Sequence, residues 1–190
     1  MKCYLLKASM NVVIAAMMVL YTVLIPALAL AASASQIDRG ASQSLTTLYK
    51  HTPGAKALAD KAVAVLVFPS IVKGGFIIAG QFGDGALRKN GKTVAYYRSL
   101  AASYGFQAGV QAYGYVLFFM DDASLQYLDN TAGFELGVGP SLVVLDAGFG
   151  KNVSTTTLQK GIYAFIFDQK GLMGGAGIQG SKITRINPNP

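Results

Sequence analysis

The sequence predicts an α+β fold with N-terminal helices packed on one side of a glycine-rich, curved antiparallel β-sheet system. Hydrophobic residues make up 52% of the 190-residue chain and charged residues only 13%. The charged share of an average soluble protein is about 25%, so this chain buries a core and is not disordered. Twenty-two glycines, ten Tyr and ten Phe favour β-structure, because interior glycine weakens helices and aromatic side chains suit pleated surfaces. Helical signals between residues 36 and 63 precede this β-like part.

The N-terminus has the profile of a signal peptide. Lys2 and Lys7 precede a long uncharged stretch whose apolar centre, residues 12–25, ends before a proline, and small residues follow up to Ala34. We therefore expect a signal peptide over residues 1–34, cleaved near Ala34, and a single domain over residues 35–190. The domain would be periplasmic and peripheral to the membrane. An uncleaved anchor is the competing interpretation, because about 20 apolar residues span a bilayer.

Two helices are predicted at the start of the domain. Ile37, Ala41, Leu45 and Leu48 recur at helical spacing and form one apolar face of a helix over residues 36–51. A second helix begins after Thr52 as N-cap, with proline at its first position, and ends near residue 63. Lys56 and Asp60 on this helix have the spacing of an ion pair.

The rest of the chain is mostly β-like. The apolar run 64–68, closed by a proline, predicts a buried strand, and Asn90-Gly91 predicts a tight hairpin turn. Asp121 and Asp122 open a short helix through Leu128, because acidic side chains favour a helix N-terminus. The other predicted strands lie within residues 104–120, 134–146, 163–167 and 171–186.

A repeated Gly-Phe pattern links the predicted strands. It occurs at Gly75-Phe76, Gly105-Phe106 and Gly133-Phe134. In residues 133–139 the alternation of strand side chains leaves one face nearly bare. Glycine in a strand marks a bend or a close backbone approach, so we expect strongly curved or tightly stacked sheets. Gly109 and Gly137 should then tolerate larger residues poorly.

The residues argue against catalysis, metal binding and a nucleotide cofactor. His51 is the one histidine of the chain, so neither a typical zinc site nor an ordinary Ser-His-Asp triad can form. The glycines around residues 74–85 lack the Gly-Lys-Ser/Thr ending of a phosphate-binding loop. Runs of basic residues with interleaved aromatics, typical of nucleic-acid binding, do not occur. Without the leader, the net charge falls from +7 to +5, which favours anionic partners but equally suits plain solubility.

Many ordered segments of the chain together resemble the SYLF domain, a lipid-binding module also described as an actin-binding domain in fungal endocytic proteins. The likeness runs from about Ser42 to Ile186. It is carried by residues 65–70, 73–76, 83–87, 97–98, 107–115, 117–120, 137–141, 163–172 and 180–186. The chain resembles a bacterial, exported, stand-alone member.

The resemblance implies non-catalytic binding of phosphoinositide-like or other acidic phospholipids, with an N-terminal amphipathic helix involved. Anionic phospholipids at a membrane surface are thus the expected partner. A structural or envelope-stress protein that acts through protein contacts is the alternative, and a homo-oligomer or an envelope protein partner stays open.

We place the expected lipid contact on basic residues near the helices and the hairpin, namely Lys50, Lys56, Lys61, Arg88, Lys89 and Lys92. Ile37, Leu45 and Leu48 would form the membrane-facing side of the helix. The same stripe would also suit docking on the sheet, so both interpretations of these three residues remain open at this stage.

Overall fold

The structure is a computed structural model that describes residues 32–130, 134–135, 142–145 and 161–190. The chain divides into two units, Met1–Ala32 and Ser33–Pro190, and the described helices and strands belong to the second. Within the described ranges, no helix is both long enough and apolar enough to cross a membrane.

The elements confirm the predicted α+β class. The sheet has the order β1-β2-β5-β3 with antiparallel pairing, and β4 adds to β5 in parallel. The elements are α2 (Ala34–His51), α3 (Pro53–Ala59), β1 (Ala64–Lys89), β2 (Lys92–Phe119), α4 (Asp122–Asn130), β3 (Phe134–Glu135), β4 (Leu142–Leu145) and β5 (Ile162–Ile186).

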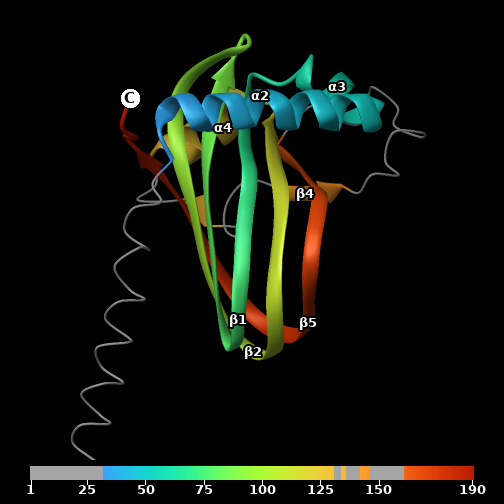
Figure 1. Cartoon of the computed structure of the whole chain (residues 1–190). Helices are drawn as coiled ribbons and strands as arrows, with labels where there is room; N and C mark the ends of the chain where they lie inside the picture. The colour runs from blue at the N-terminus through green and yellow to red at the C-terminus, as the bar shows by residue number, and fades with distance from the viewer. Residues whose placement is uncertain (1–31, 131–133, 136–141, 146–160) are drawn as a thin grey trace, which may run out of the picture. The chain divides into compact units, whose positions relative to one another are not determined.

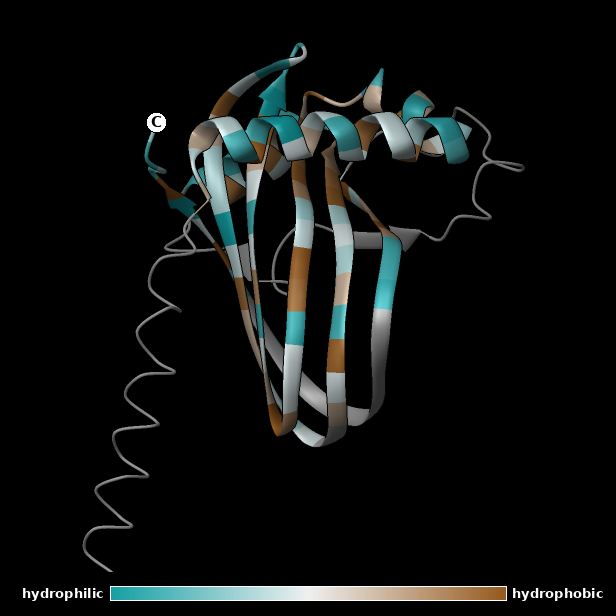
Figure 2. Cartoon of the chain, viewed as in Figure 1, coloured by the Kyte–Doolittle hydropathy of each residue, from teal (hydrophilic) through white to brown (hydrophobic). Residues whose placement is uncertain are grey.

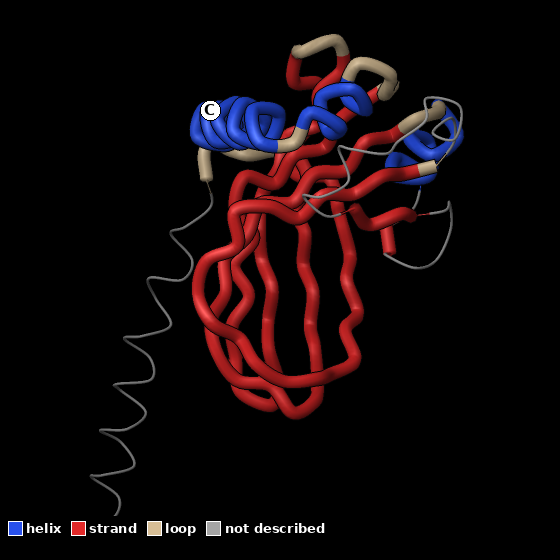
Figure 3. The backbone as a smooth tube through the Cα atoms, turned by 90° about the vertical axis from the view of Figure 1, so that its right-hand side faces the viewer, coloured by secondary structure: helices blue, strands red, loops and turns tan. Residues whose placement is uncertain are grey.

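The three long strands curve back on themselves, as predicted from the glycines. Figures 1 and 3 show β1, β2 and β5 running away from the helices, bending together at the far end and returning. In β1 the bend includes a register shift between Phe76 and Ile78, and Ile77 there has a φ of 63°. In β2 the bend includes Gly109 at a φ of 136°, a conformation that glycine adopts most readily. Each strand therefore has two arms.

Glycine lets the two arms of β1 stack closely. A Cβ atom added at Gly85 would lie 2.5 Å from the backbone oxygen of Val67, and one at Gly83 would lie 2.8 Å from the oxygen of Ser70. Those partners belong to the first arm of the same strand. This packing confirms the expectation of tightly stacked sheets. Gly133 and Gly137, where the pattern was also noted, lie outside the described residues.

The N-terminal helices differ in detail from the prediction. α2 matches the predicted helix closely, but α3 ends at Ala59 rather than near residue 63, and Thr52 makes no side-chain capping bond to it. The predicted ion pair between Lys56 and Asp60 is present. α4 begins as expected, with the Asp121 carboxylate accepting from the Ser124 backbone N–H at 2.8 Å.

The strand predicted to close at Pro69 instead continues through it to Lys89. The pairing of β1 with β2 shifts register between Phe68 and Ile71. Because β1 lies at the edge of the sheet, this irregularity admits a residue that has no backbone N–H. The hairpin is confirmed: Asn90 and Gly91 have positive φ values of 50° and 75°, and Lys89 pairs with Lys92.

The core lies at the helical end of the long strands. Leu66, Phe68 and Ile71 of β1 pack with Leu117 and Phe119 of β2, all fully buried. The apolar face of α2 also lies inward. Burial of these side chains from several elements fixes the helices on the sheet.

A first prediction concerns the start of α2, where Ser33 forms a capping box with Gln36. A chain that begins at Ser35, after cleavage at Ala34, lacks this cap. We expect it to unfold with a free energy about 1 kcal/mol lower than a chain that begins at Ala32. Urea denaturation of the two purified forms measures the difference, and identical midpoints would contradict the role given to Ser33.

Candidate functional site

The three apolar residues predicted to face a membrane lie in the core. Ile37, Leu45 and Leu48 of α2 are all buried. This corrects the prediction of a membrane-facing stripe. The physical reason is that an amphipathic face follows the same spacing whether it meets lipid or a sheet, and in this fold β1 covers it.

Several of the predicted basic residues lie around one cavity at the helical end. The cavity has a volume of about 500 Å³ and lies among α2, α3 and the β1–β2 hairpin. We call it the basic hollow. Its lining includes Lys56 and Arg88 from the predicted set, together with the turn residues Asn90 and Gly91. The remaining lining residues are Ser42, Leu45, Thr46, Tyr49, Ala59, Asp60, Ala62, Val63, Ala64 and Val65.

Arg88 joins the hairpin to α2 at the wall of the basic hollow. Its Nη2 donates to the backbone oxygen of Asp38 at 3.0 Å and to the Ser42 hydroxyl at 2.7 Å. Its Nε is buried and has no hydrogen-bond partner. A buried polar group without a partner costs about 1 to 3 kcal/mol. The guanidinium is therefore a cation with unused hydrogen-bonding capacity.

Asp38 holds α2 against β2 beside the hollow. Its two carboxylate oxygens accept from the Thr93 hydroxyl at 2.7 Å and from the Tyr96 hydroxyl at 2.9 Å. Burial and the hydrogen bond to Asp38 raise the pKa of Tyr96. With its carboxylate engaged by these two hydroxyls, Asp38 positions the helix, and Arg88 is bound to its backbone rather than to its carboxylate.

Tyr49 gives the hollow a further hydrogen-bond donor. Burial, with a smaller contribution from Asp60, raises the pKa of Tyr49 to about 12. The phenol therefore stays protonated at neutral pH and keeps its O–H. Lys56, in contrast, is exposed and paired with Asp60, so part of its charge is already balanced.

The other predicted basic residues are distributed around this end. Lys89 and Lys92 are exposed and lie opposite each other across the hairpin turn. Lys61 is exposed and lies in sequence between the lining residues Asp60 and Ala62. Lys50 is exposed in the last turn of α2 and is not part of the lining. Two of the six predicted residues, Lys56 and Arg88, therefore line the hollow. Three more, Lys61, Lys89 and Lys92, are next in sequence to residues that line it.

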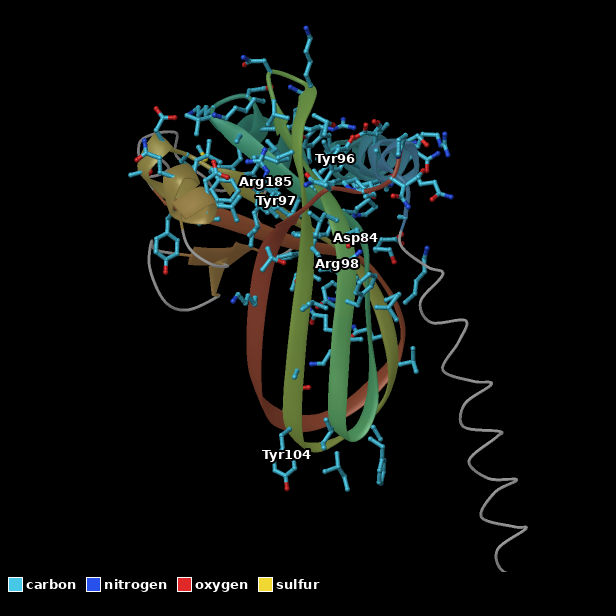
Figure 4. All side chains as sticks on the ribbon, turned by 90° about the vertical axis from the view of Figure 1, so that its left-hand side faces the viewer. Asp84, Tyr96, Tyr97, Arg98, Tyr104 and Arg185 are labelled. Carbon is cyan, nitrogen blue, oxygen red and sulfur yellow. The ribbon has the colours of Figure 1, made fainter. Side chains whose placement is uncertain are left out.

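The sequence pattern did not predict the ion pair between the buried carboxylate of Asp84 and the partly exposed guanidinium of Arg98. Arg98 donates from Nε and Nη2 to the two carboxylate oxygens of Asp84 at 2.7 and 2.9 Å. The guanidinium also lies over the Phe82 ring, 4.8 Å from its centroid. Figure 4 shows this pair on adjacent strands below Tyr96 and Tyr97. The pair is a structural link between β1 and β2 rather than part of the hollow.

The described residues hold no group of three or more His, Cys, Asp or Glu side chains that could bind a metal ion. His51, as expected of a helix-end residue, is the last residue of α2. The hydrogen-bond donors of the basic hollow are cations, hydroxyls and an amide, which suit an anion better than a metal.

The comparisons with known proteins match part of the chain to a family. A search of curated proteins found no match. A family model described as "Ysc84: Las17-binding protein actin regulator" matches residues 100–188, which include most of β2 and all of β5. This SYLF family is associated with lipid and actin binding and is not a known enzyme family. The resemblance seen in the sequence is confirmed over residues 100–188, where the chain matches the model of the Ysc84 (SYLF) family.

Proposed function

We propose that the protein binds anionic phospholipid at a membrane surface in the bacterial periplasm, with the headgroup in the basic hollow. The observation that carries the proposal is Arg88, whose guanidinium lines the hollow and donates to two neutral acceptors, the Asp38 backbone oxygen and the Ser42 hydroxyl. A phosphate oxygen is a strong acceptor for guanidinium and hydroxyl donors. The family's association with lipid binding supports this choice of ligand.

The surroundings of Arg88 suit a phosphate group. Ser42, Thr46 and Tyr49 add hydroxyl groups to the lining, and Asn90 adds an amide. The exposed lysines of the hairpin would then meet neighbouring acidic headgroups, because each cation near an anionic surface contributes about 1 kcal/mol. The leader supports the periplasmic setting, because its profile is typical of an exported protein.

The test exchanges charge at the hairpin and leaves the fold contacts intact. We expect Lys89→Glu with Lys92→Glu to weaken sedimentation with acidic vesicles by about thirtyfold or more, with strong dependence on salt. Both side chains are exposed, so the melting temperature should stay close to that of the unchanged protein.

A matched control makes the same change of charge elsewhere. Lys182→Glu with Arg185→Glu alters two exposed residues of β5, which pair with Leu100 and Tyr97 of β2 and lie away from the hairpin turn beside the hollow. This control should retain most of the binding. Equal loss in both double variants would show that only the net charge matters and would reject the hollow as the site. A protein that stays in solution with every vesicle composition would favour the alternative, a structural or envelope-stress role through protein contacts.

A further inference from the structure

The polarity of the long strands is reversed at the end away from the helices. From Ile78 to Gly83, exposed and buried residues of β1 alternate strictly. The exposed ones include Ile78 and Phe82, whereas the buried ones include Gln81. In soluble proteins large apolar side chains are mostly inside and polar ones outside. Here the apolar side chains face outward.

The inward side of these arms is filled by small and polar residues. Ala79, Ser99 and Ser103 are almost completely buried. Gln81 is buried as well and accepts from the Tyr113 hydroxyl at 2.7 Å. This bond joins the second arm of β1 to the second arm of β2. Small side chains and the Gln81–Tyr113 hydrogen bond therefore fill the inner side of these arms, and the large apolar side chains lie on the outer side.

The bends themselves expose a cluster of large apolar side chains, which we call the apolar end. Phe76 is 74% exposed, and the cross-strand pair Ile78 and Tyr104 is 66% and 69% exposed. Val72 and Val110, on the first arm of β1 and the second arm of β2, are exposed as well. Figure 4 shows Tyr104 pointing outward at the far end, and Figure 2 shows hydrophobic colour at the bend of β1. Such a gathering marks an interaction surface.

The charges of the bends favour a lipid surface as its occupant. The segments 72–83, 99–112 and 169–181 contain no Asp or Glu, and their charged residues are Lys73 and Lys170. Lys170 forms an ion pair with Asp168, which lies just before the third segment, so Lys73 contributes more of the positive charge. In register, Lys170 pairs with Ala112, which pairs with Val72, so the two lysines lie behind the bend on β5 and β1, the strands that flank β2. Apolar side chains in front and cations behind match the order of acyl chains and phosphates in a bilayer.

The backbone and the shape of the apolar end also suit a bilayer. β2 is paired with β5 through the whole bend and with β1 except at residues 105–107, so most of its polar backbone groups enter an apolar medium already hydrogen-bonded. The surface is a protruding end formed by three bent strands. Tyr104 adds an aromatic ring with a polar hydroxyl, the kind of side chain that gathers at membrane interfaces.

We propose that the apolar end inserts shallowly into the acyl region of a lipid bilayer. This inference deepens the proposed lipid-binding function, because it concerns how the protein contacts the membrane, but it rests on a separate part of the molecule. Binding through the apolar end needs no acidic lipid and resists salt, whereas binding through the basic hollow requires both acidic lipid and low salt. The two can therefore fail independently.

The chain has no tryptophan, so Tyr104→Trp provides a single fluorescent reporter at the apolar end. The protein would be purified from cells that express the whole chain. With neutral phosphatidylcholine vesicles at high salt, we expect the emission of this reporter to shift to shorter wavelength and to be quenched by brominated acyl chains. Val94→Trp is the matched control, because Val94 is exposed in β2 close to the hairpin turn, far from the bend. Its emission should not change.

A second pair of variants tests the contribution of the apolar side chains. Phe76→Ser with Ile78→Ser should lower partitioning into neutral vesicles by about tenfold or more, because two large side chains no longer enter lipid. Val94→Ser should leave partitioning unchanged. Both sites are exposed, so equal melting temperatures would verify the fold.

Three results would overturn the inference. The first is an emission from the Tyr104→Trp reporter that stays typical of water while the protein sediments with acidic vesicles, since contact would then be through the hollow alone. The second is a blue-shifted emission without vesicles together with a dimer on gel filtration, since a second copy would then cover the end. The third is unchanged partitioning of the doubly substituted variant.

Discussion

Replacement of Arg98 by Ala is expected to lower the free energy of unfolding by about 3 to 5 kcal/mol. The Asp84 side chain is only 4% exposed, and two hydrogen bonds from Arg98 balance its charge. Without the guanidinium, a buried carboxylate loses its counter-ion, and the Phe82 ring loses the cation above it. The hydrogen bonds to Asp84 raise the pKa of Arg98, so its guanidinium stays charged throughout the neutral range.

Urea denaturation followed by circular dichroism measures this loss. It is a large part of the free energy of unfolding of a typical domain, which is about 5 to 15 kcal/mol. Two further variants separate the causes. Arg98→Lys keeps the charge but not the two-pronged geometry and should lose less. Asp84→Asn with Arg98→Met removes both charges and should recover much of the stability. A single Ala variant within about 0.5 kcal/mol of the unchanged protein would contradict the role of the pair.

Gly85→Ala is expected to destabilise the fold by about 1 to 3 kcal/mol through overpacking. The new methyl group would lie 2.5 Å from the Val67 backbone oxygen and 2.6 Å from the Phe68 ring. The backbone oxygen cannot move without disturbing the other arm of β1.

Gly80 supplies the matched control, because it lies in the same strand and an added Cβ meets nothing within 4 Å. Gly80→Ala should leave stability within about 0.5 kcal/mol. Thermal and urea denaturation of both variants compare them directly. Equal losses would mean that strand glycine acts through backbone entropy instead of close packing.

Local signals in the sequence predicted the helices and the hairpin because each depends on nearby residues. The spacing of Ile37, Ala41, Leu45 and Leu48 defines α2, and Asn90-Gly91 adopts the positive φ values that its residue types allow. The repeated glycines predicted curvature for the same reason. The surface that α2 meets was not predictable in this way, because a helix docked on a sheet and a helix docked on lipid share one pattern.

The Asp84–Arg98 pair required information that the sequence pattern did not contain. Counting back from the hairpin turn with regular pairing would place Asp84 opposite Tyr97. The register shift between Leu87 and Arg88 moves it opposite Arg98 instead. A single bulge thus decides which side chains meet. The apolar end was not predicted for a related reason. In the sequence the long strands are continuous apolar segments, and only the position of the bends decides which of their side chains face solvent.

The order of strands in the sheet has a consequence for assembly of the protein. β2 lies between β1, which precedes it across a two-residue turn, and β5, which begins only at Ile162. The β1–β2 hairpin can therefore close progressively from Asn90-Gly91, whereas the other edge of β2 waits for more than 40 further residues. Until β5 arrives, that edge presents its N–H and C=O groups to any other extended chain. The interval between hairpin closure and arrival of β5 is the stage at which newly made chains are most exposed to aggregation, and where a chaperone would protect them most.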